Sequence, residues 1–248
     1  MAGDLVYFWV PVPDGDAAKR FYGELLGWEA REFPGAERRY VIVSARGKGV
    51  GGVMALPEGV SQPFWLGYVG TRDIAAALAR LADSGGAVHR GPWDIPDVGR
   101  LALVADPQGA GLALIQGAGD RQSEAFDQRS PGHGNWHELR TTDPDAALAF
   151  YARQFGWTRG DALDTGPTGT YQLIEADGTR IGGIMRAPEP ARPAWLYYFG
   201  VGSTDRATAR ITAGGGAVPH GPGEVPGGAL IVQARDPQGA AFALVGPA

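Results

Sequence analysis

Hydrophobic and polar positions follow two different periods along the start of this chain. Leu5 to Val12 is an apolar and aromatic run next to prolines, which is typical of a buried strand. Apolar residues then recur at helical spacing from Asp16 to Leu26, with aspartates at the start and Gly27 at the end. A second, Ala/Leu-rich helix is predicted at 73–84. Further strands are predicted at 39–45, 50–56, 64–70, 87–90, 100–106 and 111–116.

The whole pattern occurs twice. Phe21-Tyr22 and Gly27-Trp28 return as Phe150-Tyr151 and Gly156-Trp157, an offset of 150 − 21 = 129 residues. Asp106-Pro107-Gln108-Gly109-Ala110 returns at Asp236, an offset of 236 − 106 = 130. A repeat of this length is large enough to form a domain with its own core. The second copy predicts helices at 145–155 and 204–213 and strands at 135–142, 170–176, 181–186, 194–201, near 217, 229–235 and 240–245.

These elements define the expected fold. Each repeat reads as strand-helix-strand-strand-strand performed twice, so the fold class is α+β. We expect two tandem domains, 1–117 and 134–248, joined by a polar, Gly/Ser-rich linker at 118–133. Within a domain, two βαβββ modules side by side would form a curved sheet around a cavity.

Composition narrows the class of protein further. The formal net charge is -5 and no block of like charge stands out, which argues against nucleic acid or a membrane as a partner. The chain has no cysteine, so disulfides and thiolate chemistry are excluded. Neither a signal peptide nor a membrane-spanning run is predicted, and a cytoplasmic location is expected. A monomer and a homodimer both remain open.

The repeated motifs resemble those of the glyoxalase / bleomycin-resistance / extradiol-dioxygenase (vicinal oxygen chelate) superfamily. The resemblance rests on the D-x-D-x-x-x-x-F-Y-x-x-x-x-G-W stretch from Asp14 to Trp28 and its copy from Asp143 to Trp157. It also rests on the two D-P-Q-G-A turns and on the Gly-Gly-Ala-Val helix exits. The nearest likeness is to the tandem two-domain branch labelled "hydroxylase" or glyoxalase-like antigen.

The resemblance implies a divalent metal held by His, Glu or Gln side chains, but this chain departs from that pattern. Aligned on the shared motifs, the ligand positions carry aromatic, aliphatic or thioether residues: Tyr7, Leu66, Ala113 and the vicinity of Met54 in one half, and Trp136, Leu196, Ala243 and the vicinity of Met185 in the other. These side chains are not the usual ligands of a catalytic divalent metal. We therefore expect no metal and no other cofactor.

Alternation along the strands predicts which side chains face the expected cavities. The candidates for binding a small molecule are mostly aromatic or sulfur-containing: Tyr7, Trp9, Tyr40, Met54, Phe64, Tyr68, Trp136, Arg140, Tyr171, Met185 and Tyr198. Such walls suit a flat or apolar small molecule. The same residues could also simply fill the concave side of each sheet.

The second repeat adds a charged pair. Glu138 and Arg140 lie two apart on one strand and face the same way, where the first repeat has Trp9 and Pro11. Arg140 matches a position at which glutathione-using relatives bind a carboxylate. Glu138 is the one candidate for a catalytic acid or base. A purely structural ion pair between the two is the alternative.

Other polar residues are interpreted as structural. His137 is expected to face the helix layer, and His89 and His220 are expected in surface loops. Asp94, Asp97, Arg100 and Glu224 are expected in loops that could cover a cavity mouth. The Asp-Pro-Gln-Gly sequences are interpreted as tight turns rather than catalytic groups.

Three functions stay open at this point. The first is a metal-independent protein that binds and sequesters an apolar or aromatic compound. The second is a lyase, isomerase or hydroxylase that uses Glu138 or a non-standard metal. The third is a scaffold for protein interactions. A function inferred from the fold alone is analogy, because this fold supports many chemistries.

Overall fold

The computed structural model describes residues 5–33, 39–119 and 123–248. Its helices are α1 (Gly15–Leu26), α2 (Ile74–Asp83), α3 (Pro144–Phe155) and α4 (Thr204–Ala213), with a short 3-10 turn at Gly166–Thr168. Strands of the first repeat are β1 (Leu5–Val12), β2 (Glu29–Glu32), β3 (Tyr40–Ala45), β4 (Lys48–Ala55), β5 (Leu66–Gly70), β6 (Ala87–Ile95), β7 (Gly99–Ala105) and β8 (Gly111–Gly117). Strands of the second repeat are β9 (Gly134–Thr141), β10 (Thr158–Asp164), β11 (Thr170–Ala176), β12 (Thr179–Arg186), β13 (Ala194–Gly200), β14 (Ala217–Glu224), β15 (Leu230–Arg235) and β16 (Ala241–Gly246).

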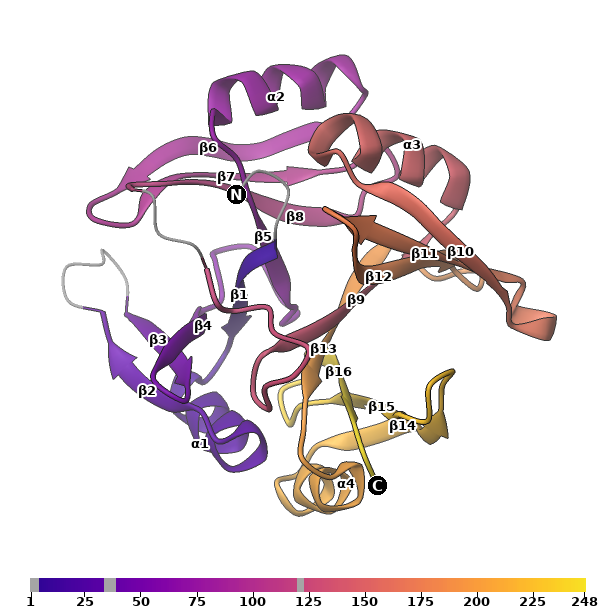
Figure 1. The fold of residues 1–248 in the computed structure, drawn as a ribbon. Coiled ribbons are helices and arrows are strands. Elements are labelled where there is room, and N and C mark those ends of the chain that lie inside the picture. Colours follow the sequence, from indigo (N-terminus) through magenta and orange to yellow (C-terminus); the bar gives the residue numbers. More distant parts are fainter. Residues whose placement is uncertain (1–4, 34–38, 120–122) are drawn as a thin grey trace. The chain divides into compact units, whose positions relative to one another are not determined.

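The predicted fold class is confirmed. The elements form four βαβββ modules in chain order, two in each repeat (Figure 1). The strand order is β2-β3-β4-β1-β5-β8-β7-β6 in the first sheet and β10-β11-β12-β9-β13-β16-β15-β14 in the second. The first and last strands of a module run parallel, as β1 does with β4 and β9 with β12. None of the helices in the described part of the chain is long and apolar enough to cross a membrane.

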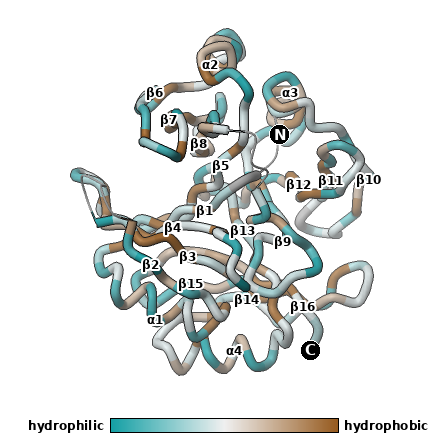
Figure 2. The backbone as a smooth tube through the Cα atoms, turned by 60° about the vertical axis from the view of Figure 1, so that its left-hand side comes forward, coloured by the Kyte–Doolittle hydropathy of each residue, from teal (hydrophilic) through white to brown (hydrophobic). Residues whose placement is uncertain are grey.

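Local sequence explains where the helices begin and end. Asp14 caps α1 by accepting hydrogen bonds from the backbone N–H groups of Asp16 and Ala17. Gly27 ends α1 with a φ of 70°, a left-handed conformation that glycine adopts without a steric penalty. The buried face of α1 is apolar and aromatic, comprising Ala18, Phe21, Tyr22, Leu25 and Leu26. Hydrophobic and hydrophilic stretches likewise alternate along α2 and α3 in Figure 2.

The modules group into two compact units that cut across the repeats. Among the residues that the structure describes, unit 1 contains 5–6, 66–119 and 137–196. Unit 2 contains residues 7–65, 123–136 and 197–248. Helices α2 and α3 pack together in unit 1, and α1 and α4 pack together in unit 2. Each unit therefore combines a module of one repeat with a module of the other.

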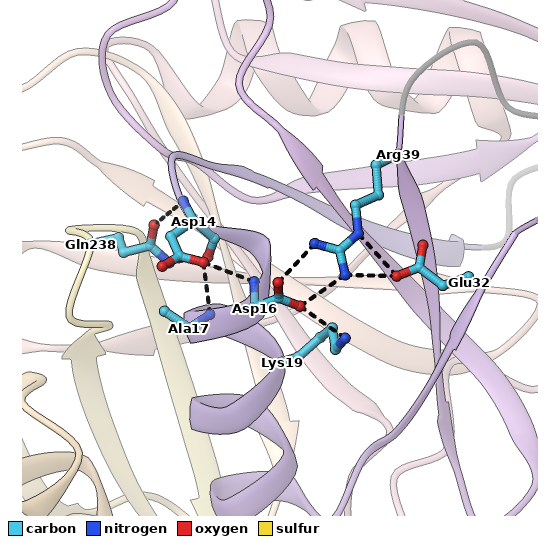
Figure 3. A network of polar contacts seen from close by, with 7 residues as sticks. All are labelled: Asp14, Asp16, Ala17, Lys19, Glu32, Arg39 and Gln238. Atoms are coloured by element: carbon cyan, nitrogen blue, oxygen red, sulfur yellow. Dashed lines mark hydrogen bonds and ion pairs between the residues drawn. The ribbon is translucent and has the colours of Figure 1, made fainter.

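In unit 2, the Asp-Pro-Gln-Gly turn of the second repeat holds the first helix of the first repeat. Asp236 accepts hydrogen bonds from the backbone of Gln238 and Ala240 through one oxygen, at 2.9 Å each. Its other oxygen accepts the Tyr22 hydroxyl at 2.9 Å. The Gln238 amide binds the backbone N–H and C=O of Asp14, at 2.6 and 2.9 Å (Figure 3). We call Asp236 and Gln238 the clamp of unit 2.

In unit 1 the roles of the repeats are exchanged. Asp106 closes its own turn and accepts the Tyr151 hydroxyl at 2.9 Å. Gln108 binds the backbone N–H and C=O of Asp143 at 2.6 and 2.8 Å. Asp106 and Gln108 are the clamp of unit 1. Both aspartates are buried, so these bonds form away from water, where an unpaired partner would be costly. The two motifs form turns, as predicted, and they also bind a helix of the other repeat.

An exposed network of charges lies beside the clamp of unit 2. Arg39 donates to both carboxylate oxygens of Asp16 at 2.8 and 2.9 Å and also to Glu32, and Lys19 reaches Asp16 at 3.0 Å (Figure 3). The hydrogen bonds from Arg39 are the main reason that the pKa of Asp16 falls well below its usual range. Because these side chains are exposed, solvent screens the network and it adds little to stability.

Two edge strands are absent from the sequence prediction. Glu29–Glu32 forms β2 and Thr158–Asp164 forms β10, each paired with one antiparallel neighbour. All four side chains of β2 are exposed. An edge strand exposed in this way carries no apolar alternation, so the pattern on which strand prediction rests is missing.

The expected loop positions of several polar residues are wrong. His89 and Asp94 lie on β6, which continues to Ile95, and His220 and Glu224 lie on β14. Arg100 lies on β7 and pairs with Asp94 at 2.9 Å. Of the group expected in loops, Asp97 alone lies in a turn, with a φ of 62°. Register shifts in the ladders accommodate Gly91-Pro92 and Gly221-Pro222 within these strands.

Candidate ligand-binding walls

The first candidate wall lies on one face of β1, β3 and β4 in unit 2. Phe8 points to the other face, where it meets Tyr197 and Phe199 with ring centroids 5.4 and 5.3 Å apart. Successive side chains alternate along a strand, so Tyr7 and Trp9 lie on the face opposite to Phe8. Trp9 is buried and contacts Phe64 edge to face at 6.2 Å.

Two tyrosines of this wall are joined through their hydroxyls. The Tyr7 hydroxyl donates to the carbonyl oxygen of Gly51, and it also shares a hydrogen bond with Tyr40. The Tyr40 side chain lies against Gly52, because a Cβ atom there would be 2.0 Å from the Tyr40 hydroxyl oxygen and 2.3 Å from Cζ. Gly52 thus leaves room for Tyr40 on the sheet.

The orientation of Gly52 identifies the face on which Tyr40 lies. A Cβ on Gly15, in the first turn of α1, would be 3.8 Å from the Val53 side chain, so Val53 faces the helix. By alternation, Gly52 and Met54 face away from α1. Along the ladders, Trp9 pairs with Gly52 and Tyr40 pairs with Met54. One continuous wall is therefore formed by Tyr7, Trp9, Tyr40 and Met54.

The second candidate wall lies on β9, β11 and β12 in unit 1. The Tyr171 ring lies against Gly183, since a Cβ there would be 2.0 Å from Cε1 and 2.4 Å from Cζ. Gly183 pairs with Glu138 and Met185 pairs with Arg140 along the parallel ladder. Tyr171, Glu138, Arg140 and Met185 are thus neighbours in this unit.

Glu138 and Arg140 form the ion pair that the sequence left as one alternative. Arg140 Nε donates to Glu138 Oε1 at 2.7 Å. The Glu138 side chain is 7% exposed and that of Arg140 is 34% exposed. A charge-assisted bond of this length orients both groups. The carboxylate is therefore held at the arginine, whereas part of the guanidinium reaches solvent.

The remaining candidate residues, which the next sentences describe one by one, are not part of either wall. Tyr68 is buried in unit 1 on β5, opposite Ala113. Tyr198 is buried in unit 2, opposite Ala243, and accepts a hydrogen bond from Gln233 at 3.2 Å. Trp136 is half-buried at the start of β9.

His137 is fully buried, and its backbone identifies the face of β9 that it occupies. A Cβ on Gly182 would lie 3.2 Å from the Cβ of His137, so these two residues share a face. Gly183 and Tyr171 lie on the other face. His137 is therefore separated by the sheet from the wall that contains Tyr171 and Glu138.

The residues at the metal positions implied by the resemblance do not fit a divalent metal. The Tyr7 hydroxyl is hydrogen-bonded to a backbone carbonyl, and Ala113 and Ala243 are fully buried with no donor atom. Leu66 and Leu196 are aliphatic. In the part of the chain that the structure describes, no three His, Cys, Asp or Glu side chains gather as a metal site would require.

Burial changes the pKa of the Tyr7 hydroxyl. It raises the pKa of Tyr7 from 10.0 to about 12, against a smaller opposing effect of the Tyr40 hydrogen bond. A folded-state pKa above the unfolded value favours the neutral phenol, so this contribution to stability is complete below pH 10 and disappears as the pH rises through 12. We expect the free energy of unfolding of Tyr7→Phe to fall less than that of wild type over this pH interval. Denaturant unfolding at several alkaline pH values measures the difference.

The control for this experiment is the same series on Tyr22→Phe. Tyr22 also has its pKa raised well above 10.0, first by burial and second by the charge of Asp236. Its replacement should lower stability already at neutral pH, because the bond to Asp236 is lost. A Tyr7→Phe profile parallel to wild type across the alkaline range would contradict the assignment of Tyr7.

The comparison with known families and proteins agrees with this architecture. The family model described as "Glyoxalase/Bleomycin resistance protein/Dioxygenase superfamily" matches residues 4–114 and 133–244. The chain belongs to this superfamily.

Relatives similar in sequence carry two kinds of name. A Mycobacterium tuberculosis protein named "Putative glyoxylase CFP32" is 33% identical over 241 residues, covering 95% of this chain and 91% of the relative. The "Anthracycline biosynthesis protein DauV" of Streptomyces sp. (strain C5) is 31% identical over 262 residues, covering 98% and 93%.

Solved structures share the fold at low identity. A Mn(II)-bound glyoxalase from Novosphingobium aromaticivorans has a TM-score of 0.68 at 17% identity, covering 99% of this chain and 82% of that one. A 2,2',3-trihydroxybiphenyl 1,2-dioxygenase from Sphingomonas wittichii has a TM-score of 0.72 at 14% identity, covering 99% and 90%.

Sequence reasoning missed the residues that support the walls. Gly52 and Gly183 were given no role from the sequence, although each lies against a tyrosine side chain. A signal was present in the sequence, because the Gly-Gly pair and the tyrosine recur together in both repeats. The link between them needed the register of the strands.

Proposed function

We propose that this chain binds a flat apolar or aromatic small molecule and does so without the divalent metal of its superfamily. The observation that carries the proposal is the chemistry of the two walls. On the sheet face turned away from α1, unit 2 presents Tyr7, Trp9, Tyr40 and Met54. Aromatic and thioether side chains favour flat, polarisable ligands, whereas they are poor ligands for a hard divalent cation.

The relatives give limited additional support. DauV is named for anthracycline biosynthesis, and anthracyclines are built on a flat system of fused rings. The proposal makes binding and sequestration the role of this chain, with domain 1 at 1–117 and domain 2 at 134–248 each supplying one of the two walls.

A fluorescence titration tests this proposal on the full chain after treatment with a chelator. The probe is 1,2-dihydroxyanthraquinone, and tryptophan emission is the readout. We expect saturable quenching without added metal, and a smaller emission change in Trp9→Phe and Trp136→Phe. The matched control is Trp93→Phe, because Trp93 lies on β6 under Arg90 at 4.8 Å and outside both walls.

Two results would contradict the proposal. One is a failure of the probe to bind. The other is a tightly bound equivalent of transition metal, detected by elemental analysis, on which binding of the probe depends. A titration in which Trp9→Phe and Trp136→Phe both behave like Trp93→Phe would show that the wall containing Trp9 and the predicted ligand-facing position of Trp136 are wrongly assigned.

One observation favours a second candidate function. Glu138 is buried and lies on the face that carries Tyr171, so a carboxylate is buried on the same face as an aromatic ring. Such a group could transfer protons in a lyase or isomerase reaction. Turnover of a bound compound that is abolished by Glu138→Gln with unchanged affinity would favour this enzyme over a binding protein.

A further inference from the structure

We infer that Tyr40 and Tyr171 are platforms that select flat ligands, and that Gly52 and Gly183 determine this specificity. The inference rests on the proposed function and specifies how the ligand is recognised. A tyrosine on a strand normally stands away from the sheet, because the neighbouring strand carries side chains on the same face. Here the neighbouring residue is glycine, and the tyrosine side chain occupies the volume of the missing side chain.

The distances require this arrangement in both units. A Cβ on Gly52 would be 2.0 Å from the hydroxyl oxygen of Tyr40, and a Cβ on Gly183 would be 2.0 Å from Cε1 of Tyr171. These separations are far shorter than a van der Waals contact between such atoms. Even one methyl group at either glycine must therefore displace the ring.

The two rings lie against the glycine backbone with different parts. Near Gly52 the closest atoms belong to the hydroxyl end of Tyr40, which is consistent with its hydrogen bond to Tyr7. Near Gly183 the closest atoms belong to the edge of the Tyr171 ring. Both tyrosine residues remain partly exposed after the side chains have packed on the sheet.

A ring held in this way favours one ligand shape. A ligand with a flat face can stack on a fixed aromatic ring over its whole area, whereas a globular ligand touches it at few atoms. Fixing the ring beforehand also removes the entropy cost of ordering it upon binding. The class of ligand is therefore a flat fused-ring compound rather than an apolar compound of any shape.

The neighbours of the two platforms differ in polarity. Trp9 is the partner of Gly52 on the adjacent strand, and Glu138 is the partner of Gly183. The Tyr40 platform is thus bordered by an indole, and the Tyr171 platform by a carboxylate paired with Arg140. We infer that the Tyr40 platform favours flat ligands that are apolar, whereas the Tyr171 platform favours flat ligands that carry polar substituents.

The test compares two probes that have the same number of carbon atoms and one carboxylate each. One is 2-naphthoate, which is flat, and the other is adamantane-1-carboxylate, which is globular. The dissociation constant of each is measured by calorimetry on the full chain. We expect wild type to prefer 2-naphthoate by roughly three- to tenfold for each ring it stacks on.

The variants Gly52→Ala and Gly183→Ala should reduce this preference, because they displace the rings. The matched control is Gly49→Ala on the same strand β4, where a Cβ meets nothing within 4 Å. Circular dichroism checks that each variant is folded. If an alanine variant does not fold, Tyr40→Leu and Tyr171→Leu remove the ring without adding volume at the glycine, whereas Tyr40→Phe and Tyr171→Phe should keep the preference.

The outcomes separate this inference from the proposed function. Any of three results would overturn the platforms. The first is equal affinity of wild type for the two probes, the second is no affinity for 2-naphthoate, and the third is an unchanged preference in the folded ring-displacing variants. The proposed function would still stand if 1,2-dihydroxyanthraquinone binds without metal. If neither that compound nor 2-naphthoate binds, both the proposed function and the platforms are wrong.

Discussion

Replacing Asp236 by alanine is expected to lower the free energy of unfolding by about 3–5 kcal/mol. Three donors lose their acceptor at once: the backbone N–H groups of Gln238 and Ala240, and the hydroxyl of Tyr22. Asp236 is 4% exposed, so water does not readily replace it. Each buried donor left without a partner costs about 1–3 kcal/mol. Denaturant unfolding monitored by circular dichroism measures the loss.

The matched variants separate the parts of this effect. Asp106→Ala should cost about as much, because Asp106 makes the same three bonds with Gln108, Ala110 and Tyr151. Tyr22→Phe removes one hydroxyl and should cost about 1–2 kcal/mol. A loss below about 1 kcal/mol in Asp236→Ala would mean that the clamp does not hold unit 2 together.

Replacing Trp28 by alanine should cost a similar amount, about 4–5 kcal/mol. The Trp28 ring contacts Tyr22, Trp65 and Phe199 at centroid distances of 5.6, 6.0 and 5.3 Å. Its indole N–H also donates to the carbonyl of Gly132 at 2.7 Å. The substitution leaves a cavity in the aromatic core of unit 2 and an unpaired carbonyl. Chemical unfolding at neutral pH provides the measurement.

Two control variants are compared with Trp28→Ala. Trp28→Phe keeps most of the ring and should cost about 1–3 kcal/mol, part of it from the lost hydrogen bond. Val88→Ala removes a side chain that is 44% exposed and should change stability by less than about 0.5 kcal/mol. If Trp28→Ala were as mild as Val88→Ala, the aromatic cluster would not be the core of this unit.

Patterns that depend on neighbouring residues were predictable from the sequence. Helices were found because their caps and apolar stripes are local, as Asp14, Gly27 and the buried residues of α1 show. Most strands were found for the same reason. The exposed edge strand β2 was not, because its stability comes from the ladder to β3 rather than from an apolar pattern of its own.

The candidate site was predictable in composition but not in contacts. Alternation alone suggested that Tyr7 and Trp9 share a face, and the strand register adds Tyr40 and Met54 as their neighbours. The ion pair of Glu138 and Arg140 was one of two alternatives, and the spacing of two residues could not distinguish a structural pair from a catalytic group. The expected absence of a metal and the identity of the ligand stay predictions.

By itself, the sequence determined that the chain is a tandem repeat of four α+β modules, because repetition, caps and periodicity are written in residues close together in the chain. Only the tertiary structure decided that modules of different repeats share a compact unit. The hydrogen bond between Tyr22 and Asp236 joins residues 214 positions apart. From the sequence alone, the tyrosine of either repeat is an equally good partner for this aspartate. Which pair forms depends on the packing of whole helices and sheets, and no local pattern specifies it.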